Sequence, residues 1–227
     1  MNQKKLAPPA PSQAVIVEAA RRNRVVTPAS LSEMSQGLSE AAAEKALRRL
    51  TRRGWLHQVR LPERRSCYTL SREAVLHLGL SKKAMKAMGQ AAVITNLAMT
   101  YFCARQKVER LTPDEMRTAY PDLDKPGLQL GNYFSDYGAS PPRLTWMLVD
   151  RAFAPDVLVR KVGKVLKKAY RFASLVQLVQ AGQFAVAVLV PNERKKWLVE
   201  RALGKRYFAQ VAVTVHVIPE IQPLLLS

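Results

Sequence analysis

The chain has 227 residues, of which 48% are apolar, and its 36 Lys and Arg against 17 Asp and Glu give a net charge of +19. This apolar content excludes a disordered chain, and the length is sufficient for two domains. The charge favours a polyanionic partner such as nucleic acid. Both parts of the chain share the excess, with 16 basic and 6 acidic residues up to Lys83 and 20 and 11 after it.

Targeting and redox signals are absent from the sequence. No stretch reaches about 18 uncharged apolar residues, so we expect no membrane span and no membrane partner. The first residues lack the apolar core of a signal peptide. Cys67 and Cys103 are the only cysteines and stand alone, which excludes a disulfide framework and a cysteine metal site. We therefore expect a cytoplasmic protein with no metal and no cofactor.

Three helices are predicted in the first part of the chain. Residues 1–11 are rich in proline and predict a disordered arm, followed by a helix over residues 12–22. Thr27 and Pro28 are typical of the start of a second, short helix. The third helix begins after Ser39 and has apolar residues at i, i+3, i+4 and i+7 spacing. Four cations fall on its opposite face: Lys45, Arg48, Arg49 and Arg52.

A basic hairpin is predicted directly after this helix. Gly54 ends the helix, and residues 55–61 and 66–70 predict two strands. Three cations lie in or beside the turn: Arg60, Arg64 and Arg65. The order helix, helix, basic helix, basic hairpin is that of a winged helix-turn-helix, here over residues 12–80. We expect the helix to enter the major groove of DNA and the hairpin to contact phosphate or the minor groove. The alternatives are a solvated helix face and a solubilising turn.

The second part predicts an α/β domain over residues 84–220, so that the chain is α+β overall, with a mixed or parallel sheet. A linker is expected at 79–83, then a long apolar helix at 84–106 that packs on a core or on a second copy, which leaves a homodimer open. A capping box at Thr112 and Glu115 begins another helix. Strands are predicted at 144–149, 184–190 and 210–218, and helices at 156–179 and 192–203.

The helix predicted at 156–179 is a second basic feature. Its apolar stripe faces one way, and an arc without acids faces the other: Arg160, Lys161, Lys164, Lys167, Lys168 and Arg171. Basic amphipathic helices also bind membranes. Because the apolar stripe lacks Trp and the neighbouring strands offer it a sheet to cover, we expect a second DNA surface here. A merely solvated face is the alternative.

Catalytic residues do not assemble from the sequence. The three histidines are scattered, and no nucleophile triad, metal-ligand cluster or glycine-rich phosphate loop stands out. The acidic candidates are Asp136 and Asp150, each at the end of a predicted strand. A metal-dependent nuclease requires two or three carboxylates that converge on one cation. We therefore expect no catalytic activity, and an active nuclease that uses Asp136 and Asp150 is the rival hypothesis.

The chain resembles the plasmid replication-relaxation family, which includes the MobC-type accessory proteins of conjugative mobilisation. The resemblance covers residues 13–220. It depends on the winged helix and on the segments Trp146-Met-Leu-Val-Asp150-Arg151, Lys164 to Tyr170, Gly182-Gln-Phe-Ala-Val-Ala-Val-Leu-Val190 and the helix from Arg194 to Leu203. Family members pair a winged helix with a domain similar to restriction endonucleases.

The resemblance implies a domain that does not cleave DNA. The family strand carries apolar-apolar-Glu-x-Asp-Arg, and here Asp150 and Arg151 are present whereas Leu148 occupies the Glu position. The implied function is that of a double-stranded DNA-binding accessory protein at an origin of transfer, which assists a relaxase or the opening of DNA. A transcriptional regulator of a mobile element is the alternative that uses the same winged helix.

Overall fold

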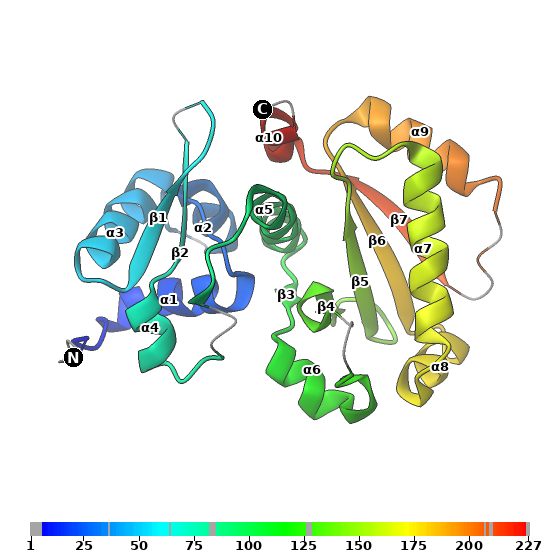
Figure 1. The fold of residues 1–227 in the computed structure, drawn as a ribbon, viewed down its shortest axis with the longest axis horizontal. Coiled ribbons are helices and arrows are strands. Elements are labelled where there is room, and N and C mark those ends of the chain that lie inside the picture. The colour runs from blue at the N-terminus through cyan, green and yellow to red at the C-terminus, as the bar shows by residue number, and fades with distance from the viewer. Residues whose placement is uncertain are drawn as a thin grey trace. The chain divides into compact units, whose positions relative to one another are not determined.

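The computed structural model describes residues 6–35, 37–63, 65–81, 85–125, 129–206, 208 and 211–225. It is a mixed α/β structure with two compact units, residues 1–100 and residues 101–226. Figure 1 shows the order of its elements. None of the helices in the described ranges combines the length and the apolar character that a membrane crossing requires.

The first unit consists of helices and one hairpin. Its elements are α1 (Pro11–Asn23), α2 (Pro28–Met34), α3 (Glu40–Arg52), β1 (Leu56–Arg60), β2 (Ser66–Leu70) and α4 (Arg72–His77). The strands β1 and β2 pair antiparallel, with Gln58 opposite Tyr68. Val26, between α1 and α2, forms an isolated antiparallel β-bridge to Tyr68, on the free side of β2. The predicted order of elements in this part of the chain is thus confirmed.

Side-chain caps explain where the helices of this unit begin. Thr27 and Ser30 form a capping box at α2, in which each side chain accepts a hydrogen bond from the other residue's backbone N–H. Ser39 accepts from the N–H of Ala42 at α3, and Ser71 accepts from the N–H of Ala74 at α4. These bonds satisfy amides that the first helical turn leaves without partners.

The arm that we expected to be disordered over residues 1–11 differs from that expectation. Residues 1–5 lie outside the described residues, but the arm is bonded to the C-terminal end of α3 from residue 6 onward. Arg53 donates to the carbonyl of Pro8 at 2.8 Å, and the Trp55 Nε1 donates to the carbonyl of Ala7 at 3.0 Å. Leu6 packs against the core. Local composition does not reveal contacts with residues more than 40 positions away.

Helix α5 (Gln90–Gln106) contains the division between the two units, after Thr100. We placed the boundary at residues 79–83, whereas residues 85–100 belong to the first unit. One reason is the buried Thr100, whose hydroxyl donates to the carbonyl of Val25 at 3.0 Å. Residues 82 and 83 of the expected linker lie outside the described part of the chain.

The second unit is built on a five-stranded sheet in the order β3-β4-β5-β6-β7. The strands are β3 (Glu109–Arg110), β4 (Tyr133–Asp136), β5 (Arg143–Val149), β6 (Phe184–Val190) and β7 (Ala212–Val217). β5, β6 and β7 are parallel, whereas β3 and β4 are antiparallel to their neighbours. The sheet is therefore mixed, one of the two forms expected.

The helices of this unit are α6 (Pro113–Ala119), α7 (Pro155–Ala169), α8 (Ala173–Gln180), α9 (Glu193–Leu203) and α10 (Gln222–Leu225). Both connections, β5 to β6 and β6 to β7, step the same way across the sheet. Because such crossovers are right-handed almost without exception, their helices lie on one face. Figure 1 shows α7, α8 and α9 along that face. The core between them includes Trp146, Val188 and Leu158.

The helix predicted at 156–179 is in fact two helices, α7 and α8. The chain leaves the helical conformation at Phe172, which is extended and is the N-cap of α8. Asp122 then accepts bonds from the N–H and the hydroxyl of Ser174, at 3.1 and 2.6 Å. A carboxylate about 50 residues upstream thus binds the first turn of α8, a tertiary contact that periodicity does not reveal.

Buried leucines determine which side of α3 faces the core. Truncation of one of them should therefore destabilise the first unit. Leu47 is fully buried. We expect Leu47→Ala to lower the free energy of unfolding by about 2–5 kcal/mol, through lost burial and a residual cavity. Arg49→Ala, at an exposed position of the same helix, should change it by less than about 0.5 kcal/mol. Urea unfolding followed by circular dichroism measures both, and equal losses would contradict the assigned azimuth.

Candidate nucleic-acid interface

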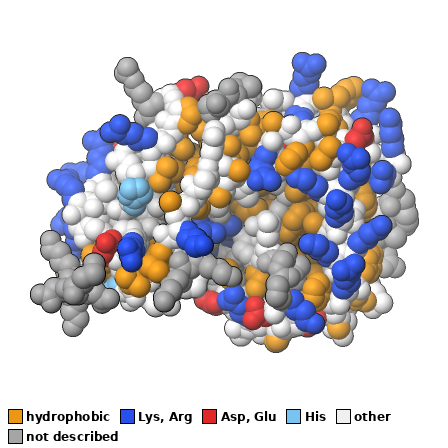
Figure 2. Space-filling model, in the orientation of Figure 1, with side chains coloured by type: hydrophobic (Ala, Val, Ile, Leu, Met, Phe, Trp, Pro, Cys, Tyr) orange, Lys and Arg blue, Asp and Glu red, His pale blue; other side chains and the backbone are white. Residues whose placement is uncertain are grey.

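Helix α3 presents cations on its solvent face because its other face is core. Ala43, Leu47 and Leu50 are fully buried. At 100° per residue, the opposite side holds Lys45, Arg49 and Arg52, and all three are exposed. None of these three cations pairs with a carboxylate in the described part of the chain. Figure 2 shows Lys and Arg gathered over this helix.

Arg48 differs from the other three cations of α3. It is exposed, but its Nη2 lies 2.5 Å from the Glu44 Oε1, one turn earlier on the helix. It also lies close to Tyr68, whose pKa is raised by burial and by Glu44, an effect that Arg48 opposes. Glu44 therefore neutralises one of the four cations predicted on this face. Lys45, Arg49 and Arg52 form what we call the α3 cation face.

The hairpin supports only part of the basic tip that the sequence predicted. Arg60 is exposed at the end of β1, opposite Ser66. Arg65 is half-buried, and its Nη2 lies 3.4 Å from the Glu63 Oε2. Its Nε is buried without a hydrogen-bond acceptor. Arg64 lies outside the described residues. Arg60 is thus the hairpin cation best placed to meet an external anion.

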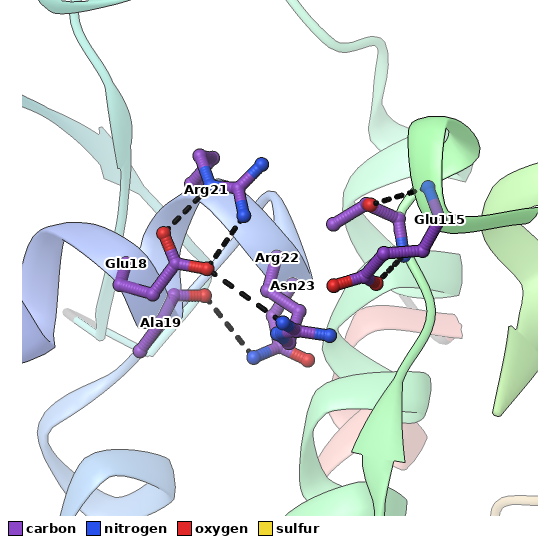
Figure 3. Close-up of polar contacts among 7 residues, drawn as sticks. Glu18, Ala19, Arg21, Arg22, Asn23 and Glu115 are labelled. Atoms are coloured by element: carbon purple, nitrogen blue, oxygen red, sulfur yellow. Dashed lines mark hydrogen bonds and ion pairs between the residues drawn. The ribbon is translucent and has the colours of Figure 1, made fainter. Parts of the chain in front are cut away.

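Other cations of the first unit are engaged within the chain (Figure 3). Glu18 on α1 accepts two bonds from Arg21, at 2.6 and 2.7 Å, and lies 3.8 Å from Arg22. Asn23 donates to the carbonyl of Ala19 at the end of the same helix. The positive charge of α1 is therefore partly neutralised within that helix. The cations of the α3 cation face have no such ion pair with a described carboxylate.

Helix α7 carries the second basic surface. Leu158, Val162 and Leu166 face the sheet and are buried. The exposed cations are Arg160, Lys164, Lys167 and Lys168 on the helix and Arg171 just after it. Within the described ranges these five side chains form no ion pair. In Figure 2 they contribute to the Lys and Arg side chains that cover the visible face of the second unit.

Lys161 faces inward and does not belong to this exposed set. Its Nζ lies 3.1 Å from the centroid of the Phe153 ring, a close cation–π contact. Burial lowers its pKa, and Arg151 and Lys164 lower it further, whereas Asp150 acts in the opposite direction. Lys161 therefore contributes to the local structure at the N-terminal end of α7 rather than to the exposed face.

Asp150 is buried at the carboxyl end of β5. It is 0% exposed, and its Oδ1 accepts a bond from the N–H of Phe153 at 2.8 Å. Its Oδ2 lies 3.3 Å from the Lys195 Nζ, which also donates to the carbonyl of Phe153. Asp150 thus connects the start of α9 to the loop between β5 and α7. These contacts give the carboxylate a structural function.

Asp136 is the last residue of β4 and lies beside the amino end of β5. It is opposite Arg143 in the pairing of β4 with β5, seven residues before Asp150. At about 3.3 Å per residue, the two carboxylates are roughly 23 Å apart. Asp136 accepts from the N–H groups of Gly138 and Ala139, at 3.1 and 3.2 Å, and caps a turn. At this separation the two carboxylates cannot hold the same metal ion.

Among the described residues, no group of three or more His, Cys, Asp or Glu side chains is placed to hold a metal ion. Leu148, where the resembled family has Glu, is 8% exposed and packs in the core between sheet and helices. Burial raises the pKa of both Cys67 and Cys103 to about 12, so neither thiol is an active nucleophile at neutral pH.

Trp197 was not among the residues predicted from the sequence to bind DNA. Trp197 on α9 is 56% exposed, and the guanidinium of Arg201 lies 5.3 Å from the centroid of its ring. Arg194, one turn earlier, is exposed as well. The signal was present in the sequence, since positions 194, 197 and 201 follow i, i+3, i+7 spacing and share one side of a helix.

The chain matches no protein-family model, no curated protein and no solved structure.

Replacement of Asp150 should affect stability, because its partner Lys195 would keep a poorly solvated charge. The Lys195 side chain is only 19% exposed. We expect Asp150→Asn to lower the free energy of unfolding by about 3 kcal/mol, near the lower end for a broken buried pair. Asp136→Asn, which retains a side-chain acceptor, should cost less than about 1 kcal/mol. Chemical unfolding compares them, and an Asp150→Asn protein as stable as the wild type would refute the structural function.

Proposed function

We propose that this protein binds double-stranded DNA through the α3 cation face, as a winged helix-turn-helix with α3 as the recognition helix. The observation that carries the proposal is a helix whose buried side fixes three exposed cations on the other, none of them in an ion pair with a described carboxylate: Lys45, Arg49 and Arg52. Arg and Lys bind guanine edges and phosphates, and a helix fits the major groove of B-DNA.

The elements around α3 support this proposal. Helices α2 and α3 are consecutive and pack together, and the hairpin β1–β2 follows at once, with Val26 bridging to Tyr68. Ala41 and Ala42 are exposed in the first turn of α3. Because the N-terminal residues of a recognition helix approach the base edges, small side chains there allow a close approach. Arg60 on the hairpin would then meet a flanking phosphate.

The exposed cations of α7 give the second unit its own affinity for the same polyanion. Five exposed cations on and just after one helix, without ion pairs to described carboxylates, attract phosphates by release of condensed counterions, without reading sequence. We infer that this surface adds non-specific affinity, whereas α3 provides contacts to base edges. We propose no covalent chemistry, because Asp136 lies beside the amino end of β5 whereas Asp150 follows its carboxyl end, too far apart to hold one metal ion.

The biological setting that we propose is plasmid or mobile-element mobilisation in the cytoplasm. The support is the resemblance to the replication-relaxation family at Asp150 and Arg151, together with a basic surface on each of the two units. The protein would bind at an origin of transfer and assist a relaxase or the opening of DNA. Protection of an origin of transfer from nuclease digestion would support this setting, and protection of a promoter would favour a regulator.

The α3 cation face can be tested with a double substitution. We expect Arg49→Ala with Arg52→Ala to weaken binding to duplexes of unrelated sequence by similar factors, because phosphate contacts are lost. The slope of log affinity against log salt concentration should become less negative by about 2, roughly 0.9 for each lost phosphate contact. Fluorescence anisotropy with labelled duplexes at several salt concentrations measures both effects.

Arg117→Ala is the matched control for this experiment. Arg117 is an exposed arginine on α6, but Asp114 and Asp124 hold its guanidinium at 2.7 and 3.0 Å. Removal of an arginine that is already neutralised should leave the affinity and its salt dependence unchanged. A folded double variant that binds duplex DNA as tightly as the Arg117→Ala protein would overturn the assignment of α3.

A further inference from the structure

We propose that the outer surface of α9, beside α7, binds an unpaired DNA strand, with Trp197 as a stacking platform for a base. This inference rests on the proposed function, since it requires DNA as the partner, and it adds single-stranded DNA as a second ligand. The surface consists of Arg194, Trp197 and Arg201 on α9 and the exposed cations of α7.

The exposure of Trp197 is the first observation. The chain has three tryptophans, and the other two, Trp55 and Trp146, are 2% and 8% exposed, against 56% for Trp197. The neighbours of Trp197 on the helix surface are charged rather than apolar, namely Arg194 and Arg201 together with Glu193 and Glu200. Arg201 lies 5.3 Å from the ring centroid and still leaves more than half of the side chain accessible. An aromatic ring amid arginines is typical of sites where nucleic-acid bases stack.

The azimuth of α9 is fixed by its contacts. Val199 is fully buried, and Lys195 reaches inward to Asp150 and Phe153. At 100° per residue, Trp197 lies about 160° from Val199, so its ring points away from the sheet. Arg194 and Arg201 are on the same outer stripe, with α-carbons about 10.5 Å apart at 1.5 Å per residue. One indole thus stands between two guanidinium groups.

Helix α7 supplies phosphate-binding charge next to this stripe. The two helices pack against each other, and Lys161 on α7 contacts Phe153, the residue whose carbonyl Lys195 on α9 binds. Both helices follow parallel strands, so both run back from the carboxyl edge of the sheet. Lys164 and Lys168 follow Lys161 along α7 at helical spacing, on the same side of that helix, and both are exposed. The helix that packs against α9 therefore carries cations that an oligonucleotide bound at Trp197 could meet.

An unpaired strand fits this surface better than a duplex does. In a duplex each base face is covered by its neighbours, whereas an unpaired strand can place a base on an aromatic ring while its phosphates meet cations. Arg194 and Arg201 form no ion pair with a described carboxylate, so both are available to phosphates. Such a surface would hold one strand once a duplex has been opened.

The test uses the full-length protein and fluorescently labelled oligo(dT) of about 16 nucleotides in anisotropy titrations at 150 mM salt. Trp197→Ala should weaken oligo(dT) binding by about 5- to 150-fold, the range for loss of one stacked base. Trp197→Phe should restore most of the affinity, since a flat ring remains. Tyr137→Ala is the matched control, because Tyr137 is a 73% exposed aromatic residue at the end of β4, away from α9, and should have no effect.

Intrinsic fluorescence gives a second, independent readout. Because Trp55 and Trp146 are buried, base stacking on Trp197 should produce a saturable quenching of the wild-type emission by oligo(dT). The same number of nucleotides in a duplex should produce little quenching, although it binds. Circular dichroism verifies that each variant is folded, which we expect for substitutions at exposed positions.

The outcomes separate the two proposals. If the wild-type protein binds neither duplex nor oligo(dT), the proposed function itself fails. If duplex binding is normal but oligo(dT) neither quenches the emission nor depends on Trp197, the stacking inference is overturned and the proposed function stands. An equal loss of duplex and oligo(dT) affinity in Trp197→Ala would also overturn it, because the residue would then be a general DNA contact.

Discussion

Burial of one side of each amphipathic helix is the constraint on which the proposed interfaces depend. Once Leu47 and Leu50 are inside the core of the first unit, α3 has a single azimuth, and its charged side chains must face solvent. The same holds for α7, where Leu158 and Val162 pack on the sheet. The apolar residues thus position the cations, although they contact no ligand.

Neutralisation within the chain decides which of these cations remain available. Arg48 pairs with Glu44, Arg65 lies close to Glu63, and Arg117 lies between two carboxylates. Lys161 and Lys195 are occupied around Phe153 and Asp150. A net charge of +19 therefore overstates the number of free cations, but three exposed ones share one side of α3 and five lie on or just after α7, none of them in an ion pair with a described carboxylate. That concentration, rather than total charge, is the argument for specific DNA-binding surfaces.

Periodicity predicted most elements of the fold, because each depends on local pattern and on caps close in sequence. The hairpin, the capping box at Thr112 and Glu115 and the strand of β6 occur where the sequence places them. The errors share one cause, namely contacts between distant residues. Asp122 caps α8 and separates it from α7, and Arg53 binds the N-terminal arm.

In the candidate sites, too, features set by local sequence pattern were predictable, whereas features set by contacts between distant residues were not. The exposed cations of α3 and α7 were predictable from helix geometry, since a helix has a fixed angular period. The pairing of Arg48 with Glu44 was also within reach, because these residues are four apart. The separation of Asp136 from Asp150 required the register of β4 against β5. The exposure of Trp197 could be seen only from the packing of α9, because a tryptophan is an apolar residue and the other two in this chain are buried.

The most direct measurement of the central claim is DNA cleavage by an iron–EDTA probe attached through cysteine at position 52 of α3. Both native cysteines are buried with a pKa of about 12, so an introduced Arg52→Cys thiol reacts selectively. The account predicts cuts in bound duplex from this position, and none above background from Arg117→Cys on α6. Cuts from position 117 alone, or from neither position while DNA is bound, would contradict it.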